Sequence, residues 1–117
     1  MLRPGRDWAF PTRREGAPVA GFSAEQRTLT LDAIRACTED VDDVNAARFL
    51  ARYEAELDGT TVAYVGSLRL AAVGDTVRID GPSVWIELRM DEPYSTAEAH
   101  PHSVWRDRHT DYGGLRP

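Results

Sequence analysis

The apolar residues of this chain change their spacing at Gly59. Before Gly59 they recur at intervals of three and four residues, which is the period of an amphipathic helix. After it, β-branched and aromatic residues stand in short runs separated by glycine-containing turns, which is typical of antiparallel strands. A chain of 117 residues has room for a single hydrophobic core. We therefore predict an α+β fold in which two helices pack on a small antiparallel β-sheet.

Two helices are predicted before the change in spacing. The first covers residues 23–37 and begins with a capping box, in which the Ser23 hydroxyl accepts from the Gln26 N–H and the Gln26 side chain reaches back. The second covers residues 42–59 and ends at a glycine, which suits the left-handed position after a helix. Its apolar stripe is formed by Ala46, Phe49, Leu50, Tyr53 and Leu57.

The strands are predicted after Gly59. They cover residues 61–65, 76–79, 83–88 and 102–106, with residues 91–99 as a loop. The second and third strands form a hairpin, because Asp80-Gly81-Pro82 is a turn sequence. In the third strand the apolar residues share one face, whereas Trp85, Glu87 and Arg89 share the other. A polar face that carries a tryptophan indicates a surface used for binding.

Residues 1–20 are rich in proline, glycine and arginine and lack a core of their own. They are predicted to form an extended arm, followed by a single α+β domain over residues 21–117. Trp8 and Phe10 are large apolar side chains that are costly to leave in water. We therefore expect the arm to dock on its own domain or on a partner.

Composition excludes several classes of protein. The formal net charge is −5 and all 14 basic residues are arginine, which argues against nucleic-acid binding and excludes a Schiff-base lysine. The single cysteine, Cys37, cannot form an intrachain disulfide and is predicted to be a small buried residue. No apolar run approaches the roughly 20 residues of a membrane span, and no signal peptide is evident. We expect a cytoplasmic protein that binds neither nucleic acid nor a membrane.

Two histidines stand two residues apart in the predicted last strand. Side chains alternate across a strand, so His100 and His102 should share a face, with Arg106 in the same register. Neutral imidazoles can bind Zn, Cu or Fe. Two ligands are too few for a tight site, so others would come from another chain or from Glu87, Asp107, His109 or Asp111. The alternative is a pair of histidines that only make hydrogen bonds or face solvent.

The neighbouring polar and aromatic residues also have two interpretations each. Arg106 could bind a carboxylate or a phosphate through two nitrogens, while Asp107 could instead anchor the following turn. Glu87 could act as a general base, or it could form a cross-strand ion pair with Arg78 or Arg89. Trp85 and Trp105 could line a ligand pocket, or pack against the arm. The candidate ligand-binding residues are Trp85, Trp105, Arg78 and Tyr112.

Three motifs resemble the closing part of a protein family known as DUF3500. They are Gly81-Pro82-Ser83-Val84-Trp85-Ile86-Glu87, then His100-x-His102-Ser103-Val104-Trp105-Arg106-Asp107, then Asp111-Tyr112-Gly113. The resemblance covers residues 20–113. Members of the family are longer and carry an upstream Gly-His-His motif. The chain also departs from the family pattern at Arg108, where a proline is usual.

The resemblance implies a fold region and candidate positions, but no settled activity, so two functions remain open. The first is a small-molecule enzyme of specialised metabolism, with His100, His102, Arg106 and Glu87 as catalytic residues. It would work with or without a divalent metal held by His100, His102 and Asp107. The second is a non-catalytic binding or accessory subunit. If the family site is divided between two halves, this chain would form a homodimer or a complex with another chain.

Overall fold

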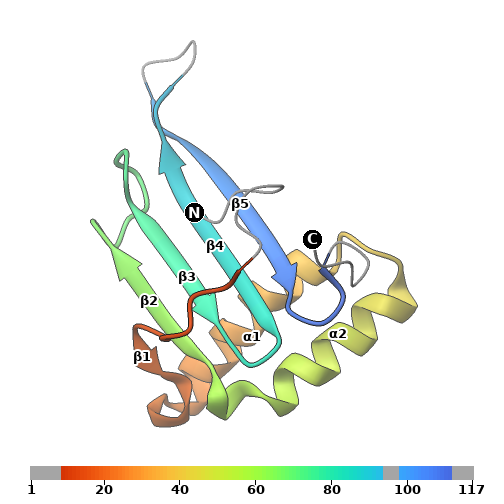
Figure 1. Ribbon diagram of the computed structural model, residues 1–117. Helices are drawn as coiled ribbons and strands as arrows, with labels where there is room; N and C mark the ends of the chain where they lie inside the picture. Colours follow the sequence, from red (N-terminus) through yellow and green to blue (C-terminus); the bar gives the residue numbers. More distant parts are fainter. Residues whose placement is uncertain (1–8, 94–97, 112–117) are drawn as a thin grey trace.

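The computed structural model describes residues 9–93 and 98–111 (Figure 1). In chain order, the elements are β1 (Ala17–Pro18), the 3-10 turn η1 (Val19–Gly21), α1 (Ala24–Thr38), α2 (Asp43–Ala55), the 3-10 turn η2 (Leu57–Gly59), β2 (Thr61–Val65), β3 (Thr76–Asp80), β4 (Val84–Asp91) and β5 (His100–Asp107). The strands form one antiparallel sheet whose order follows the chain, β1-β2-β3-β4-β5. The predicted α+β fold is confirmed.

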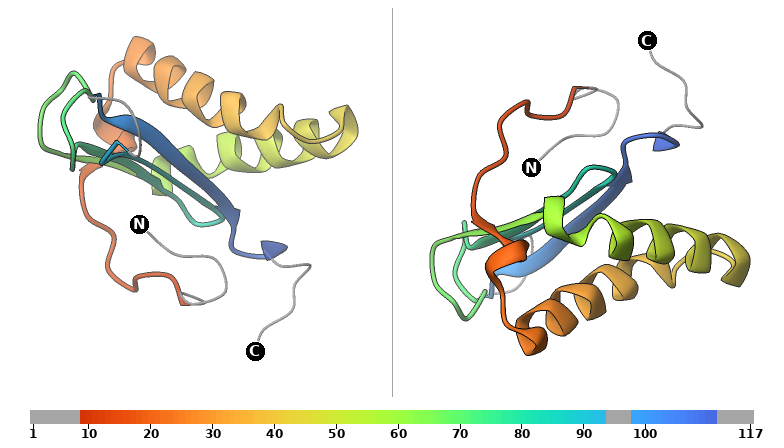
Figure 2. Two further views of the ribbon diagram at one scale, coloured as in Figure 1. Left: turned by 90° about the horizontal axis from the view of Figure 1, so that it is seen from above. Right: turned by 90° about the horizontal axis from the view of Figure 1, so that it is seen from below.

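The sheet separates the two helices from the N-terminal segment. Both helices lie against one face, while residues 9–16 cross the opposite face (Figure 2). The core lies between the helices and the sheet and includes Val19, Ile34, Tyr53, Leu57, Ile79, Val84 and Ile86. No helix in the described residues is long and apolar enough to cross a membrane.

The helices begin where the sequence predicts. At α1 the Gln26 N–H donates to the Ser23 hydroxyl at 3.2 Å, and the Ser23 N–H donates to the Gln26 side chain at 2.9 Å, so the capping box is confirmed. The α2 helix ends at Ala55, and the predicted end at Gly59 was wrong. After Ala55 the chain forms the 3-10 turn η2. The last carbonyl groups of a helix commonly accept such shorter-range hydrogen bonds.

The strands lie close to their predicted positions. The hairpin between β3 and β4 is confirmed, and residues 61–65 form β2. β5 begins at His100, two residues earlier than predicted, and β4 continues to Asp91. The connection between them is therefore shorter than the predicted loop over residues 91–99.

The arm and the domain are joined more closely than predicted. β1 pairs with the first residues of β2, and Val19 is fully buried in the core, so the domain begins before residue 21. Gly16 adopts a φ of +113°, and a side chain there would overlap the Val62 carbonyl. This close approach brings the arm onto the sheet face opposite the helices.

The loop between β2 and β3 is organised around one carboxylate. The backbone N–H groups of Ser67, Ala71 and Ala72 donate to Asp75, as does the Ser67 hydroxyl. These bonds, the one from the Ser67 hydroxyl first among them, lower the pKa of Asp75 to about 2.

Asp75→Asn should lower the stability of the domain at neutral pH and flatten its dependence on pH below 4. A carboxyl group whose pKa is lower in the folded state stabilises the fold above its unfolded pKa, about 3.9, and this contribution is lost as the pH falls through the folded value. The check is chemical denaturation of both proteins from pH 7 to pH 2. Asp58→Asn, at an exposed carboxylate, is the matched control. Curves for D75N that parallel the unmodified protein would contradict the assignment.

Candidate functional site

Four of the predicted site residues lie together on the sheet face opposite the helices. In the strand register, Trp85 is directly opposite Arg106 on β5, and Glu87 is directly opposite Arg78 on β3. Successive residues of β4 alternate between the two faces, so Trp85 and Glu87 point to the same side. We call Arg78, Trp85, Glu87 and Arg106 the arm-covered site, because the N-terminal segment lies over this face (Figure 2).

Three of the four residues of the arm-covered site are buried, and Arg78 is partly exposed. Trp85 and Glu87 are each 1% exposed, and Arg106 is 5% exposed. Phe10 of the N-terminal segment lies over them, with its ring 5.9 Å from the Trp85 ring. The guanidinium carbons of Arg106 and Arg108 lie 4.3 and 4.2 Å from the centre of the Phe10 ring. Cation–π attraction therefore contributes to holding the arm in place.

Ion pairs connect the charged groups of this face. Arg78 Nη2 lies 3.3 Å from Glu87 Oε1, so the predicted cross-strand ion pair is confirmed for Arg78. Arg106 Nε donates to the Asp111 carboxylate at 2.7 Å, and its Nη2 lies against the same oxygen. Arg106 does hold a carboxylate, as its residue type suggested, but that carboxylate belongs to the chain itself.

Two hydrogen-bond donors of the arm-covered site have no acceptor among the described residues. They are Arg78 Nε and Trp85 Nε1, both buried, and the Arg78 guanidinium carbon lies 4.7 Å from the Trp85 ring centre. A buried acceptor without a donor among the described residues, Glu56 Oε2, lies elsewhere, in the carboxylate whose other oxygen accepts from Ser83. A buried donor without an acceptor costs about 1–3 kcal/mol. Such groups require an explanation, and one explanation is a missing ligand.

A hollow adjoins this site. It has a volume of about 420 Å³ and is lined by Phe10, Pro11, Thr12, Arg14 and Arg108. Sequence reasoning missed Arg108, although it stands where the chain departs from the family pattern. Its Nη2 donates to Asp80 at 2.6 Å, and its guanidinium carbon lies 5.7 Å from the Trp85 ring. Phe10 was expected to dock, but its target could not be read from the sequence.

The two histidines share a face, as predicted. Their Nε2 atoms are 2.8 Å apart, and their ring centres are 4.7 Å apart. They lie at the start of β5, whereas Arg106 lies near its end. At about 3.3 Å per residue, His102 and Arg106 are roughly 13 Å apart along the strand. The structure therefore does not bring the histidines and Arg106 together, and Glu87 lies between them in the register, opposite Val104.

Asp107 is not available as a metal ligand to the histidine pair. It points to the opposite face of β5, where it accepts hydrogen bonds from Tyr53 Oη at 2.9 Å and from the N–H groups of His109 and Thr110. Burial raises the pKa of a carboxyl group, but these hydrogen bonds outweigh it and lower the pKa of Asp107. The alternative prediction, that Asp107 anchors the following turn, is confirmed. Within the described ranges, no three His, Cys, Asp or Glu side chains gather to hold a metal.

Trp105 lies on the helix side of the sheet, so Trp85 and Trp105 do not line one pocket. It packs edge-on against Phe49, with ring centres 5.1 Å apart, and its indole N–H donates to Tyr53 Oη at 3.3 Å. The remaining ligand-binding prediction, Tyr112, lies outside the described residues.

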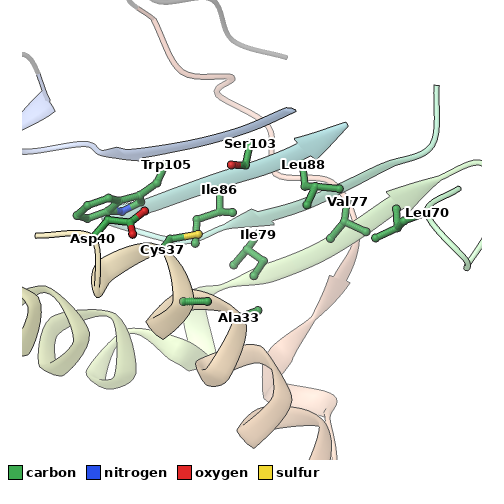
Figure 3. A pocket seen from close by; sticks show the side chains of 11 residues that line it. Ala33, Cys37, Asp40, Leu70, Val77, Ile79, Ile86, Leu88, Ser103 and Trp105 are labelled. Atoms are coloured by element: carbon green, nitrogen blue, oxygen red, sulfur yellow. The ribbon is translucent and has the colours of Figure 1, made fainter. Parts of the chain in front are cut away.

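Trp105 also lines a second cavity, of about 660 Å³, between α1 and the sheet (Figure 3). The walls are mostly apolar, and Cys37 and Asp40 stand at one side. Burial, and then the nearby Asp40, raises the pKa of the Cys37 thiol. Cys37 is only half-buried, less than the sequence predicted, and this shift disfavours the thiolate that a nucleophile needs.

Tyr53→Phe should lower the free energy of unfolding by about 1–3 kcal/mol, because Asp107 loses a donor and the Trp105 indole loses its acceptor while both stay largely buried. Urea denaturation at neutral pH measures the change. Tyr64→Phe is the matched control, since Tyr64 is 58% exposed. Equal losses in the two variants would show that the Tyr53 hydroxyl does not carry this contact.

No curated protein and no solved structure matches the chain. A family model, described as "Protein of unknown function (DUF3500)", matches residues 2–114. The match includes the N-terminal segment, which the resemblance over residues 20–113 had left out. The segment that covers the site is thus part of the family's own pattern. The chain belongs to the DUF3500 family.

Proposed function

We propose that this protein binds a small anionic molecule at the arm-covered site. The observation that carries the proposal is the pair of buried donors, Arg78 Nε and Trp85 Nε1, that have no acceptor in the described part of the chain. Both are donors, so the missing group must offer lone pairs. A carboxylate or a phosphate does so and also matches the planar geometry of a guanidinium.

The charges around the site support an anion. Four arginines gather on this face with three carboxylates, which leaves one positive charge in excess among these residues; they are Arg14, Arg78, Arg106, Arg108, Asp80, Glu87 and Asp111. Arginine is well suited to bind anions where water is scarce, because its charge is delocalised and weakly hydrated.

The N-terminal segment would control access to the site. Trp85 is covered, so a ligand must lie between the segment and the sheet or displace Phe10. The adjoining hollow of about 420 Å³ falls within the range of small-molecule pockets. Segments that close over a ligand exclude water and strengthen the electrostatic interactions beneath them.

Catalysis on the same ligand is a second candidate, favoured by the burial of Glu87. A carboxylate that is 1% exposed and lies beside an arginine could accept a proton from a ligand that the arginine orients. This is the small-molecule enzyme of specialised metabolism that the sequence analysis left open. Glu87 and Arg106 are kept as its catalytic residues, and the histidine pair is not part of it. We propose the cytoplasm as its compartment, in keeping with a single free cysteine.

A panel of small anions should raise the melting temperature of the unmodified protein in a thermal-shift screen. The panel contains acetate, benzoate, succinate, citrate and inorganic phosphate. We expect at least one member to stabilise the fold and to quench or enhance tryptophan fluorescence, because Trp85 would gain a hydrogen bond. Arg78→Met and Trp85→Phe should each reduce the shift, because each removes one of the two donors.

Arg35→Met is the matched control, because Arg35 pairs with Asp32 on the exposed surface of α1. It should respond to the panel as the unmodified protein does. The stability of R78M without ligand is measured separately, since this change also leaves Glu87 without its ion pair. Shifts that are equal in R78M, R35M and the unmodified protein, or no shift with any anion at millimolar concentration, would contradict the proposal and favour an accessory subunit.

A further inference from the structure

The histidine pair lies at the start of β5, four residues along the strand from Arg106, and has the geometry of a chelate. The Nε2 atoms of His100 and His102 are 2.8 Å apart. Zinc–nitrogen bonds of about 2.0–2.1 Å at a tetrahedral angle separate two nitrogens by roughly 3.3 Å. A small rotation of the two rings would move the Nε2 atoms apart by a fraction of an ångström, and both atoms could then bind one ion.

Two imidazoles supply half of the ligands that tetrahedral zinc requires. The described residues bring no third His, Cys, Asp or Glu side chain to the pair. His102 is exposed, and in the described part of the chain β5 is an edge strand that pairs only with β4 (Figure 1). Ligands from another molecule can therefore reach the ion along this edge.

Exposed apolar residues mark the same end of the sheet. Val65 is 67% exposed. It lies at the same level of the sheet as His102, because Val65 pairs with Thr76, Thr76 with Arg89, and Arg89 with His102 on successive strands. Leu68 and Val73 of the adjoining loop are also exposed. Apolar groups gathered in this way often indicate an interface. We call Val65, Leu68 and Val73 the apolar end of the sheet.

A hollow of about 450 Å³ lies between the apolar end and the histidines. It is lined by Val73, Arg89, Asp91, Glu92 and Pro93. Asp91 stands opposite His100 in the strand register. Its carboxylate lies 3.0 Å from Arg89 Nε, and Arg89 is opposite His102, so this ion pair adds no net charge beside the histidines. The two imidazoles are therefore the groups that would bind a cation here.

We propose that one zinc ion joins two copies of this chain through His100 and His102 of each copy. A two-fold axis through the ion presents the same pair twice, which completes four imidazole ligands without any other protein. The second copy also covers the apolar end of the sheet and the open edge of β5. Exposed strand edges of this kind are favourable sites for association.

The test measures mass and metal content together, with protein purified without a histidine tag. Light scattering coupled to size exclusion should report a monomer in EDTA and a dimer in zinc chloride. Elemental analysis of the dimer should give one zinc ion for two chains. With cobalt(II) in place of zinc, the dimer should show the strong visible absorption of a tetrahedral site.

His102→Ala should remove the metal-dependent dimer and the cobalt spectrum, while circular dichroism shows that the exposed substitution leaves the fold intact. His109→Ala is the matched control, because His109 lies beyond the other end of β5; it should dimerise like the unmodified protein. Three results would each overturn the proposal. They are one zinc ion bound per monomer, a dimer that persists in EDTA, and a dimer of H102A in zinc.

Discussion

The first half of strand β4, from Val84 to Glu87, is buried on both faces, and the arrangement around it depends on that constraint. Its apolar residues, such as Ile86, enter the core beneath the helices, while Trp85 and Glu87 point to the opposite side. A buried carboxylate without a partner is strongly destabilising. The fold therefore needs an arginine opposite Glu87 and a cover over Trp85, and the N-terminal segment provides that cover.

The parts of the fold that could be predicted from the sequence are those that short-range chemistry determines. The capping box at Ser23 and the turn between β3 and β4 depend on residues that are neighbours in the chain, and both are present. The end of α2 and the start of β5 depend on packing between distant segments. Their predicted positions differ from the observed ones by a few residues.

The same distinction applies to the candidate site, where neighbouring residues could be predicted but contacts between strands could not. Arg78, Trp85, Glu87 and Arg106 meet because β4 pairs with its two neighbours in one particular register. A shift of a single residue would have put Trp85 and Trp105 on the same side, because side chains alternate between the faces of a strand. The alternation of side chains along a strand correctly predicted that the two histidines share a face. Sharing a face does not bring them near Arg106, because each residue adds about 3.3 Å of distance along the strand.

The order of the strands in the sheet has a consequence for how the protein folds. Each of the strands β2 to β5 pairs with the next one in the chain, so these pairings close only short loops. β1 is different, because both helices separate it from β2. β1 contributes only two residues to the sheet, so the N-terminal segment would detach before the helix-sheet core in partial unfolding. Amide hydrogens of the β1–β2 pair would then exchange with solvent through an opening far less costly than global unfolding.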